Sequence, residues 1–388
     1  MDKIFDEIIR TNDSSLIYEQ ALNYYYGRDN LEIDYDLSIQ LFEKALELGE
    51  VHAKYYIAES FYFGRGVKIN YQKAFEMFCE VADKQNNAYA KSYLAIMYYY
   101  GKYVEKNYEK AYNIFCELIE QYDDKYSKYY IGLMYYNGNY VKKDYEKAYG
   151  IFEQLSINFD DDYAQYQLGE MYYNGEYVKK DENKAIDFWN KAIAKNNSMA
   201  LRRLAKLYCS EEKKDYKKAI EYYKVLVQNY NEYEDKIELA EIYQKENYYD
   251  KALEILEKLL DTDTTGFIHY TIGEIYHIQK NDRRAVEFLE IAVSKGADVA
   301  KIILGEIYLD KKQDQHALEM YKTCLDSEIA IVRTWAKYVL GSIYYYGKEK
   351  GLDVEERKEE GLKLIKEAAD ENLKEAIKVL KEIKYAKN

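Results

Sequence analysis

The sequence contains no proline among its 388 residues and only 18 glycines. Proline and glycine are the residues that most often mark turns and flexible linkers, so their scarcity argues against linkers between separate domains. No run of about 18 apolar residues occurs, so we expect no membrane-spanning helix. The first ten residues carry acids and lack the apolar stretch of a secretory signal peptide.

Cysteine and histidine are also scarce, with four of each. The cysteines lie far apart, and we interpret them as reduced, semi-buried thiols of a cytoplasmic protein, because disulfides are rare in that compartment. His269 and His277 lie eight residues apart on one predicted helix. That spacing is about 12 Å, too far for one metal ion. No Gly-rich phosphate loop, Ser–His–Asp or Cys–His arrangement occurs, so we expect no metal, no cofactor and no catalysis.

The formal net charge of the chain is −14. Affinity for nucleic acid comes mostly from Lys and Arg side chains that neutralise phosphates, so an acidic surface predicts that nucleic acid is not a partner. The same charge favours solubility and attracts basic surfaces. We therefore expect a protein or peptide partner, with a basic one as an option.

Tyrosine is abundant, with 49 residues, and many of them recur at a fixed period. The stretch Tyr98–Ala111 returns as Tyr135–Ala148 and again as Tyr172–Ala185. A period in this range is the signature of a solenoid, in which each repeat packs only against its neighbours. The glycines of the series follow one another every 37 residues, at Gly27, Gly64, Gly101, Gly138 and Gly175.

Each repeat is predicted to hold two helices. The first helix carries a small residue where the two helices approach closely, and it ends at the glycine of the series, which suits a left-handed C-terminal position. A valine in the loop is predicted to plug the space between helices. An Asn or Asp then caps the second helix. The caps are Asn70, Asn107, Asp144 and Asp181, and the valines are Val67, Val104, Val141 and Val178.

The period shortens after about residue 200, where the alanines of the second helix follow one another at steps of 34, 33, 33 and 32 residues. We predict four parts. Residues 1–12 form a shielding helix, residues 13–195 hold five repeats of 37 residues, residues 196–330 hold shorter repeats, and residues 331–388 hold a final repeat and a capping helix.

Residues 14–195 resemble the Sel-one-like repeat (SLR) family, and residues 196–330 resemble the shorter tetratricopeptide unit. The resemblance implies an all-α fold, a right-handed superhelical α-solenoid of stacked antiparallel helix pairs. It also implies adaptor and assembly proteins that bind other proteins. In three repeats Tyr103, Tyr140 and Tyr177 replace the second loop glycine of the family, which leaves the local loop shape open. The residues that match include Leu168-Gly169, Tyr172, Gly175, Val178, Asp181 and Lys184-Ala185.

The tyrosine pairs at the end of each first helix suggest a binding surface. We predict that the first tyrosine of a pair, such as Tyr98, belongs to the core. Its neighbour, about 100° further round the helix, is expected to line the concave face together with acids. Tyrosine is favoured at binding hot spots because it offers area, a hydroxyl and few rotatable bonds. The predicted partner-binding residues are Tyr25, Tyr55, Glu59, Tyr62, Tyr99, Tyr129, Tyr136, Tyr166, Glu170 and Tyr173.

Three functions are compatible with these patterns. The first is a non-catalytic scaffold or adaptor that holds a peptide or protein in a groove lined by Tyr and Glu. The second is an immunity-type inhibitor that wraps a basic toxin or nuclease, suggested by the acidic charge alone. The third is a hydrolase, although no cluster of titratable residues in the sequence supports it. The tyrosines have a second explanation, since an AT-rich genome encodes Tyr, Lys, Asn and Ile often and Pro rarely.

Overall fold

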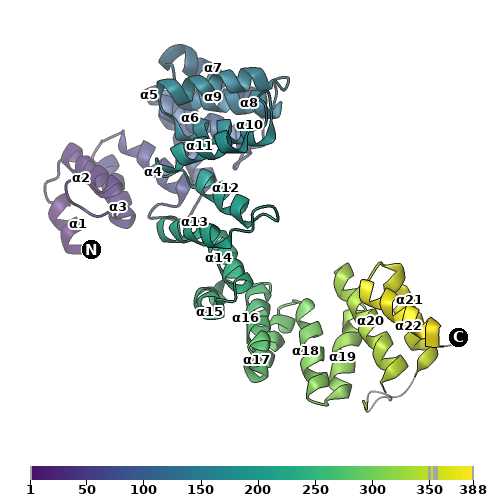
Figure 1. Ribbon diagram of the computed structural model, residues 1–388. Coiled ribbons are helices and arrows are strands. Elements are labelled where there is room, and N and C mark those ends of the chain that lie inside the picture. The colour runs from purple at the N-terminus through teal and green to yellow at the C-terminus, as the bar shows by residue number, and fades with distance from the viewer. Residues whose placement is uncertain (1, 348–350, 353–356, 387–388) are drawn as a thin grey trace. The chain divides into compact units, whose positions relative to one another are not determined.

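A computed structural model describes residues 2–347, 351–352 and 357–386 of the chain. These residues form 22 α-helices and one short 3₁₀ turn, with no strand among them. The prediction of an all-α solenoid of stacked helix pairs is thereby confirmed. Internal contacts divide the chain into two units, residues 1–201 and residues 202–388, and each is described by itself (Figure 1).

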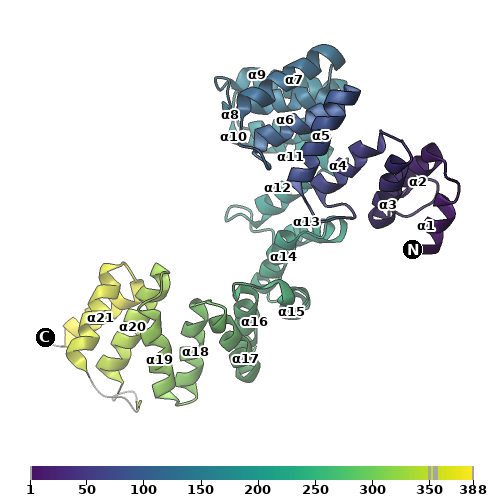
Figure 2. The ribbon, with the colours of Figure 1, turned by 180° about the vertical axis from the view of Figure 1, so that it is seen from behind.

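Unit 1 is a stack of helix pairs in which each helix packs against the helix before it and the helix after it. Helices α5 to α11 lie side by side in both Figure 1 and Figure 2. A leading helix, α1 (Asp2–Ile9), packs against the first pair. The pairs are α2 (Ser14–Tyr26) with α3 (Tyr35–Glu47), α4 (Ala53–Phe63) with α5 (Tyr71–Gln85), α6 (Ala88–Tyr100) with α7 (Tyr108–Tyr122), α8 (Lys125–Asn137) with α9 (Tyr145–Asn158), and α10 (Asp162–Asn174) with α11 (Glu182–Ile193).

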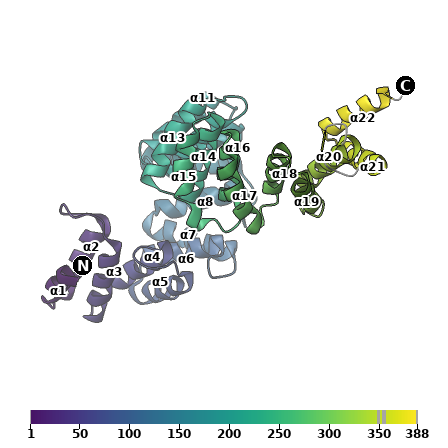
Figure 3. The same cartoon turned by 90° about the horizontal axis from the view of Figure 1, so that it is seen from below.

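Unit 2 continues the alternation of helices with shorter connections, and Figure 3 shows α18, α19 and α20 next to one another. The last described helix, α22, packs against α21. The loop predicted after Gly347 falls partly on residues 348–350, which lie outside the described residues. The helices are α12 (Ser198–Cys209, which begins in unit 1), α13 (Tyr216–Asn229), α14 (Tyr233–Lys245), α15 (Tyr249–Glu257), α16 (Phe267–Ile278), α17 (Asp282–Ser294), α18 (Val299–Asp310), α19 (Asp314–Cys324), α20 (Ala330–Tyr346), α21 (Lys358–Asp370) and α22 (Lys374–Ala386), with the 3₁₀ turn at Leu260–Thr262.

The helix ends of unit 1 follow the predicted chemistry. The five glycines of the series adopt left-handed conformations, with φ between +64° and +76°, so each supplies the turn that a residue with a Cβ resists. The predicted caps are also confirmed. The side chain of Asn107, for example, accepts a hydrogen bond of 2.9 Å from the backbone N–H of Lys110. Local sequence thus sets where each helix begins and ends.

Small residues allow the two helices of a pair to approach closely, as predicted. A Cβ added to Gly132 would lie 2.7 Å from the ring of Phe152, and one added to Gly169 would lie 2.4 Å from the ring of Trp189. Such distances are shorter than any van der Waals contact. The large aromatic residue of the second helix therefore occupies the space that the glycine leaves in the first.

The loops keep one shape although the second loop glycine is replaced in three repeats. Gly66 has φ of +70°, and Tyr103, Tyr140 and Tyr177 have φ of +67°, +64° and +62°. A Cβ added to Gly66 would come within 2.3 Å of the carbonyl oxygen of Tyr35, so glycine is required at that position. The tyrosines therefore retain the left-handed turn of the glycine that they replace.

Candidate functional site: a tyrosine-lined groove

The first helices of four successive repeats, α4, α6, α8 and α10, form a groove of about 430 Å³ in unit 1. Nine of its thirteen lining residues are tyrosines, and we call it the tyrosine groove. All the lining residues come from the first helix of a repeat, so this face of unit 1 is lined by equivalent helices. The lining residues are Tyr55, Glu59, Tyr62, Phe63, Tyr89, Ser92, Tyr93, Ile96, Tyr100, Tyr126, Tyr129, Tyr130 and Tyr163.

Glu59 is the one charged residue that lines the groove. Its side chain is buried, and its two carboxylate oxygens accept hydrogen bonds of 2.7 Å from the hydroxyls of Tyr25 and Tyr93. The guanidinium of Arg65 lies 3.8 Å from the same carboxylate and donates a 2.6 Å hydrogen bond to Tyr25. The charge of Glu59 is therefore already compensated inside the protein.

The second helix of each pair holds the groove tyrosines in place from behind. The ring of Tyr93 stacks on Phe78, with ring centroids 4.8 Å apart and ring planes 4° from parallel. One repeat further, Tyr130 stacks in the same way on Phe115, at 5.0 Å and 2°. Because both phenylalanines are fully buried, the wall of the groove is an extension of the core.

Exposed aromatic rings stand along the groove at intervals of one repeat. Tyr89, Tyr126 and Tyr163 are 65%, 47% and 45% exposed. Tyr89 lies against Tyr55, with ring centroids 6.2 Å apart, and Tyr163 lies against Tyr129, at 5.7 Å. Each contact joins one repeat to the next and leaves an accessible aromatic face, which suits contact with a ligand.

Four hydroxyls in the wall of the groove are shifted further from ionisation by their surroundings. Burial raises the pKa of Tyr55, Tyr93, Tyr129 and Tyr130 above the ordinary value for tyrosine. For Tyr93 the negative charge of Glu59 raises the pKa further. These four side chains are thus neutral phenols, which can both donate and accept hydrogen bonds.

A repeated contact connects each loop to the tyrosine of the repeat before it. The residue directly after the glycine of the series reaches the second tyrosine of the preceding pair, 40 positions earlier. We call these contacts the junction contacts. Arg65 donates to Tyr25 at 2.6 Å, the ammonium of Lys102 lies 4.6 Å above the ring of Tyr62, Asn139 donates to Tyr99 at 3.1 Å, and Tyr136 donates to Glu176 at 2.5 Å.

The repeated helix pairs match a known protein family. The model of the Sel1 repeat matches eight segments, which together span more than half of the chain: residues 18–50, 51–86, 88–123, 125–156, 162–197, 198–225, 266–296 and 336–373. The chain belongs to the Sel1 repeat family. A tetratricopeptide repeat model also matches residues 237–266. Sel1 repeats generally mediate protein–protein interactions, and Sel1 repeat proteins are generally non-catalytic scaffolds.

One solved structure shares the fold of this chain, and a second is a weaker match. A protective antigen of uropathogenic Escherichia coli strains with an SLR fold is 22% identical, with a TM-score of 0.53 over 99% of this chain and 82% of that one. A Sel1 repeat protein from Oxalobacter formigenes is 24% identical over 51% of this chain and 77% of that one, with a TM-score of 0.42. A search of the curated proteins finds no match.

The junction contacts change the interpretation of the tyrosine pairs in these Sel1 repeats. Tyr25, Tyr62 and Tyr99 are only 3%, 6% and 6% exposed, whereas Tyr98, the first tyrosine of its pair, is half-buried. All three second tyrosines are therefore buried. The prediction that they are accessible on the concave face is wrong for Tyr25 and Tyr99, whereas Tyr62 still lines the tyrosine groove. The physical reason is that the loop of the next Sel1 repeat covers the ring and engages it.

The other predicted residues fall into two groups. Tyr55, Glu59, Tyr62 and Tyr129 line the tyrosine groove. Tyr136 is half-buried and engaged by its junction contact, while three residues of α10 are half-buried and do not line the groove. Whether any of them binds a partner stays a prediction. The three residues of α10 are Tyr166, Glu170 and Tyr173.

Sequence reasoning missed the most exposed members of the groove. Tyr89, Tyr126 and Tyr163 follow one another at 37 residues, the same period as the glycines, so a search for every periodic aromatic position could have found them. Phe63 and Tyr100 lie directly before Gly64 and Gly101, are also 37 residues apart, and were missed as well. The accessible aromatic surface thus belongs to positions next to the predicted ones.

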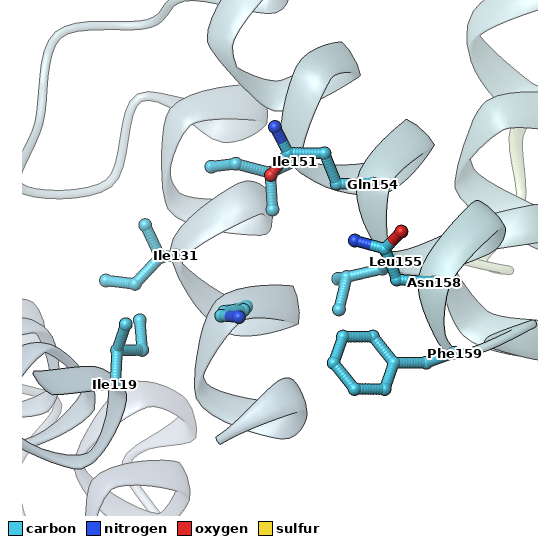
Figure 4. A pocket seen from close by; sticks show the side chains of 8 residues that line it. Ile119, Ile131, Ile151, Gln154, Leu155, Asn158 and Phe159 are labelled. Carbon is cyan, nitrogen blue, oxygen red and sulfur yellow. The ribbon is translucent and has the colours of Figure 1, made fainter. Parts of the chain in front are cut away.

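A second, smaller cavity of about 220 Å³ lies among α7, α8 and α9 (Figure 4). Ile119, Ile131, Ile151 and Leu155 make it apolar, and Phe159 lies at one side (Figure 4). The amides of Gln154 and Asn158 and the ammonium of Lys128 add polar groups. This cavity is about half the volume of the tyrosine groove and carries fewer aromatic rings.

The described residues offer neither a cluster for a metal ion nor a membrane-spanning helix. No group of three or more His, Cys, Asp or Glu side chains there could hold a metal ion. No helix in the described part of the chain is long and apolar enough to cross a membrane. The four cysteines are free thiols, and burial raises the pKa of Cys209 and of Cys324 to about 11. Thiols with a raised pKa are poor nucleophiles at neutral pH.

Proposed function

We propose that this Sel1 repeat protein is a non-catalytic scaffold that binds an extended segment of a partner protein in the tyrosine groove. The observation that carries the proposal is the row of exposed rings at Tyr89, Tyr126 and Tyr163 over a wall of stacked aromatic side chains. Large rings that are partly exposed and held by the core contribute contact area at a small cost in conformational entropy.

The family assignment supports the general part of this proposal, and the groove supplies the specific part. Three of the rings, those of Tyr89, Tyr126 and Tyr163, are exposed by nearly half or more. Contiguous exposed aromatic surface is unusual on monomeric proteins and often marks an interaction site. We therefore assign partner binding to α4, α6, α8 and α10 of unit 1.

Photo-crosslinking in the native cell tests the assignment. The photoreactive residue p-benzoylphenylalanine replaces Tyr126 in the groove or, as a control, Tyr122 on α7, which is 46% exposed and does not line the groove. We expect a light-dependent product from position 126 and none from position 122. Equal products from both positions, or none from position 126, would contradict the assignment.

The partner identified by mass spectrometry is then purified and titrated. The double variant Tyr89→Ala/Tyr126→Ala should weaken binding at least about ten-fold, which corresponds to about 1.4 kcal/mol. The matched control is Tyr122→Ala/Tyr177→Ala, which removes two tyrosines of similar exposure outside the groove. Because all four side chains are partly exposed, neither variant should unfold the protein, which circular dichroism verifies.

An inhibitor of a basic toxin or nuclease is the second candidate function. Residues 1–201 hold 33 acidic and 23 basic side chains, a net charge of −10. A partner held by that charge would dissociate as salt rises, because exposed charges are screened. Binding that is insensitive to salt between 50 and 500 mM would favour the scaffold over the inhibitor.

A further inference from the structure

The loops that join the two helices of a repeat lie side by side along one edge of unit 1. A loop contacts the start of the second helix in the preceding repeat. The hydroxyl of Tyr140 donates to Glu109 at 3.4 Å, and that of Tyr177 donates to Glu146 at 3.3 Å. We call this surface the loop edge, and it comprises residues 64–74, 101–111, 138–148 and 175–185.

The loop edge is basic, although unit 1 as a whole is acidic. It holds 12 basic and 7 acidic side chains, whereas the rest of residues 1–201 holds 11 basic and 26 acidic ones. Several of its acids are engaged inside the protein. Asp144 and Asp181 cap second helices, and Glu176 accepts hydrogen bonds from two tyrosine hydroxyls. The exposed charged side chains of the edge are therefore ten lysines and only three glutamates.

Four of the exposed lysines are held at equivalent places by aromatic rings. The ammonium of Lys110 lies 5.1 Å from the ring centroid of Tyr98. Lys73, Lys147 and Lys184 make the same contact in their own repeats, at 5.0–5.2 Å. A ring face attracts a cation and limits its motion without neutralising it. The edge thus presents positive charges that are positioned before any ligand binds and that recur once in each repeat.

Exposed tyrosines lie among these lysines. Tyr103, Tyr140 and Tyr177 are 52%, 53% and 55% exposed, and the ring of Tyr140 packs on Tyr112 of the preceding repeat, with centroids 5.3 Å apart. The left-handed conformation of these tyrosines costs free energy in a residue with a Cβ, and glycine supplies it without that cost, as Gly66 does in the first of the four loops. Strain that keeps a half-exposed ring on the surface is typical of functional positions.

We propose that the loop edge is a second binding surface, which takes an acidic segment of a partner protein that also carries large apolar side chains. Its carboxylates meet the exposed ammonium groups, and its apolar side chains pack on the exposed tyrosine rings. No residue of the loop edge lines the tyrosine groove, so the proposal does not rest on the function assigned to the groove. The two surfaces take different segments, and replacement of Tyr177 leaves a ligand of the groove unaffected.

Two other occupants with negative charge fit the loop edge less well. A nucleic acid carries a phosphate on every nucleotide, so its backbone would also meet the three exposed glutamates, Glu105, Glu109 and Glu146. A peptide can place its acids opposite the lysines alone. A second copy of this chain could offer its own acidic surface, but a net charge of −14 on each copy opposes their association.

Three fluorescent probes of twelve units test the proposal against the full chain. The first is a peptide that repeats Glu-Asp-Phe, the second has Gln and Asn in place of its acids, and the third is a single strand of twelve thymidines. In anisotropy titrations the acidic peptide should bind at least about ten-fold more tightly than the other two. Its affinity should fall at least about five-fold between 50 and 500 mM NaCl, because exposed charges are screened. Equal binding of the two peptides, or tighter binding of the oligonucleotide, would overturn the proposal.

Charge reversal places the binding on the loop edge. Lys142→Glu/Lys179→Glu should weaken the acidic peptide at least about ten-fold. The matched control Lys84→Glu/Lys191→Glu changes the net charge equally at exposed positions outside the edge and should have less than about a three-fold effect. Equal effects of the two variants would contradict the assignment. Self-association of the unliganded chain that Lys142→Glu/Lys179→Glu abolishes, measured by sedimentation, would assign the edge to a second copy and overturn the proposal.

Glycine substitutions test the tyrosines without disturbing the turn. Tyr103→Gly/Tyr140→Gly keeps the left-handed loop shape that Gly66 already has, so circular dichroism should not change. The acidic peptide should bind at least about five-fold more weakly to this variant, and unchanged affinity would contradict a role for the rings. The groove variant Tyr89→Ala/Tyr126→Ala should leave the acidic peptide unaffected. An equal loss in the groove variant would show that the loop edge is not a separate site.

Discussion

Replacement of Glu59 by alanine should destabilise unit 1 more than any substitution of an exposed acid. The side chain is 8% exposed and holds Tyr25, Tyr93 and Arg65 together. A hydrogen bond to a charged group contributes about 1.5–3 kcal/mol, and removal of one partner from a buried charged network costs about 3–5 kcal/mol. We expect a loss of about 3–5 kcal/mol in the free energy of unfolding of unit 1.

Urea denaturation measures this loss when the fluorescence reports on unit 1 alone. The chain has two tryptophans, Trp189 in unit 1 and Trp335 in unit 2. The background variant Trp335→Phe leaves Trp189 as the sole tryptophan reporter. With a slope of about 2–3 kcal/mol per molar urea, Glu59→Ala should lower the midpoint by about 1–2 M.

Two controls separate the network from the simple loss of an acid. Glu76→Ala removes an exposed carboxylate from α5 and should change stability by less than about 0.5 kcal/mol. Glu59→Gln keeps the length and one acceptor but loses the charge, so it should lie between the two. The reasoning is refuted if Glu59→Ala shifts the midpoint no more than Glu76→Ala does.

Two further predictions concern packing and pH. Gly169→Ala should reduce the free energy of unfolding by about 1–3 kcal/mol, because the new methyl group clashes with Trp189. Gly150→Ala places no atom within 4 Å of the new Cβ and should stabilise α9 by up to about 1 kcal/mol. Thermal unfolding compares the two variants, and equal effects would contradict close packing at Gly169. Burial raises the pKa of Asp263, but hydrogen bonds from His269 outweigh it and hold that pKa below its usual range. The stability that Asp263 supplies is therefore full above about pH 4 and is lost as the pH falls further. The variant Asp263→Asn should reduce the change in the urea midpoint between pH 5 and pH 3. If the midpoint of the variant depends on pH as strongly as that of the parent protein, the pairing of Asp263 with His269 is contradicted.

The fold was predictable from the sequence because its determinants are local. The left-handed glycines, the Asn and Asp caps and the small residues of the first helices each act within one helix pair, and they recur in register. Gly132 illustrates this. Its place in the repeat was enough to predict that the second helix of the pair packs closely against it. The period of 37 residues then extends each local inference to the other repeats of unit 1.

The binding surface was harder to predict because it depends on the neighbouring repeat. Tyr98 and Tyr99 are adjacent and chemically identical, and which one is accessible depends on the rotation of α6 and on the loop that follows α8. Asn139 from that loop covers Tyr99. No local pattern around Tyr99 contains this information. Exposed rings such as Tyr126 share the period, but nothing in composition separates them from structural tyrosines.

The junction contacts also give the repeats an order. Proteins built from near-identical units can misfold when a unit docks on the wrong neighbour or on another chain. Here the residue that engages the preceding tyrosine changes from Arg65 to Lys102, Asn139 and Glu176, so it is positive at the first two interfaces, neutral at the third and negative at the fourth. A slip by one repeat would exchange these partners and bring Lys102 into the place where Arg65 meets Glu59. Variation at one loop position thus makes the third and fourth interfaces chemically distinct from the first two.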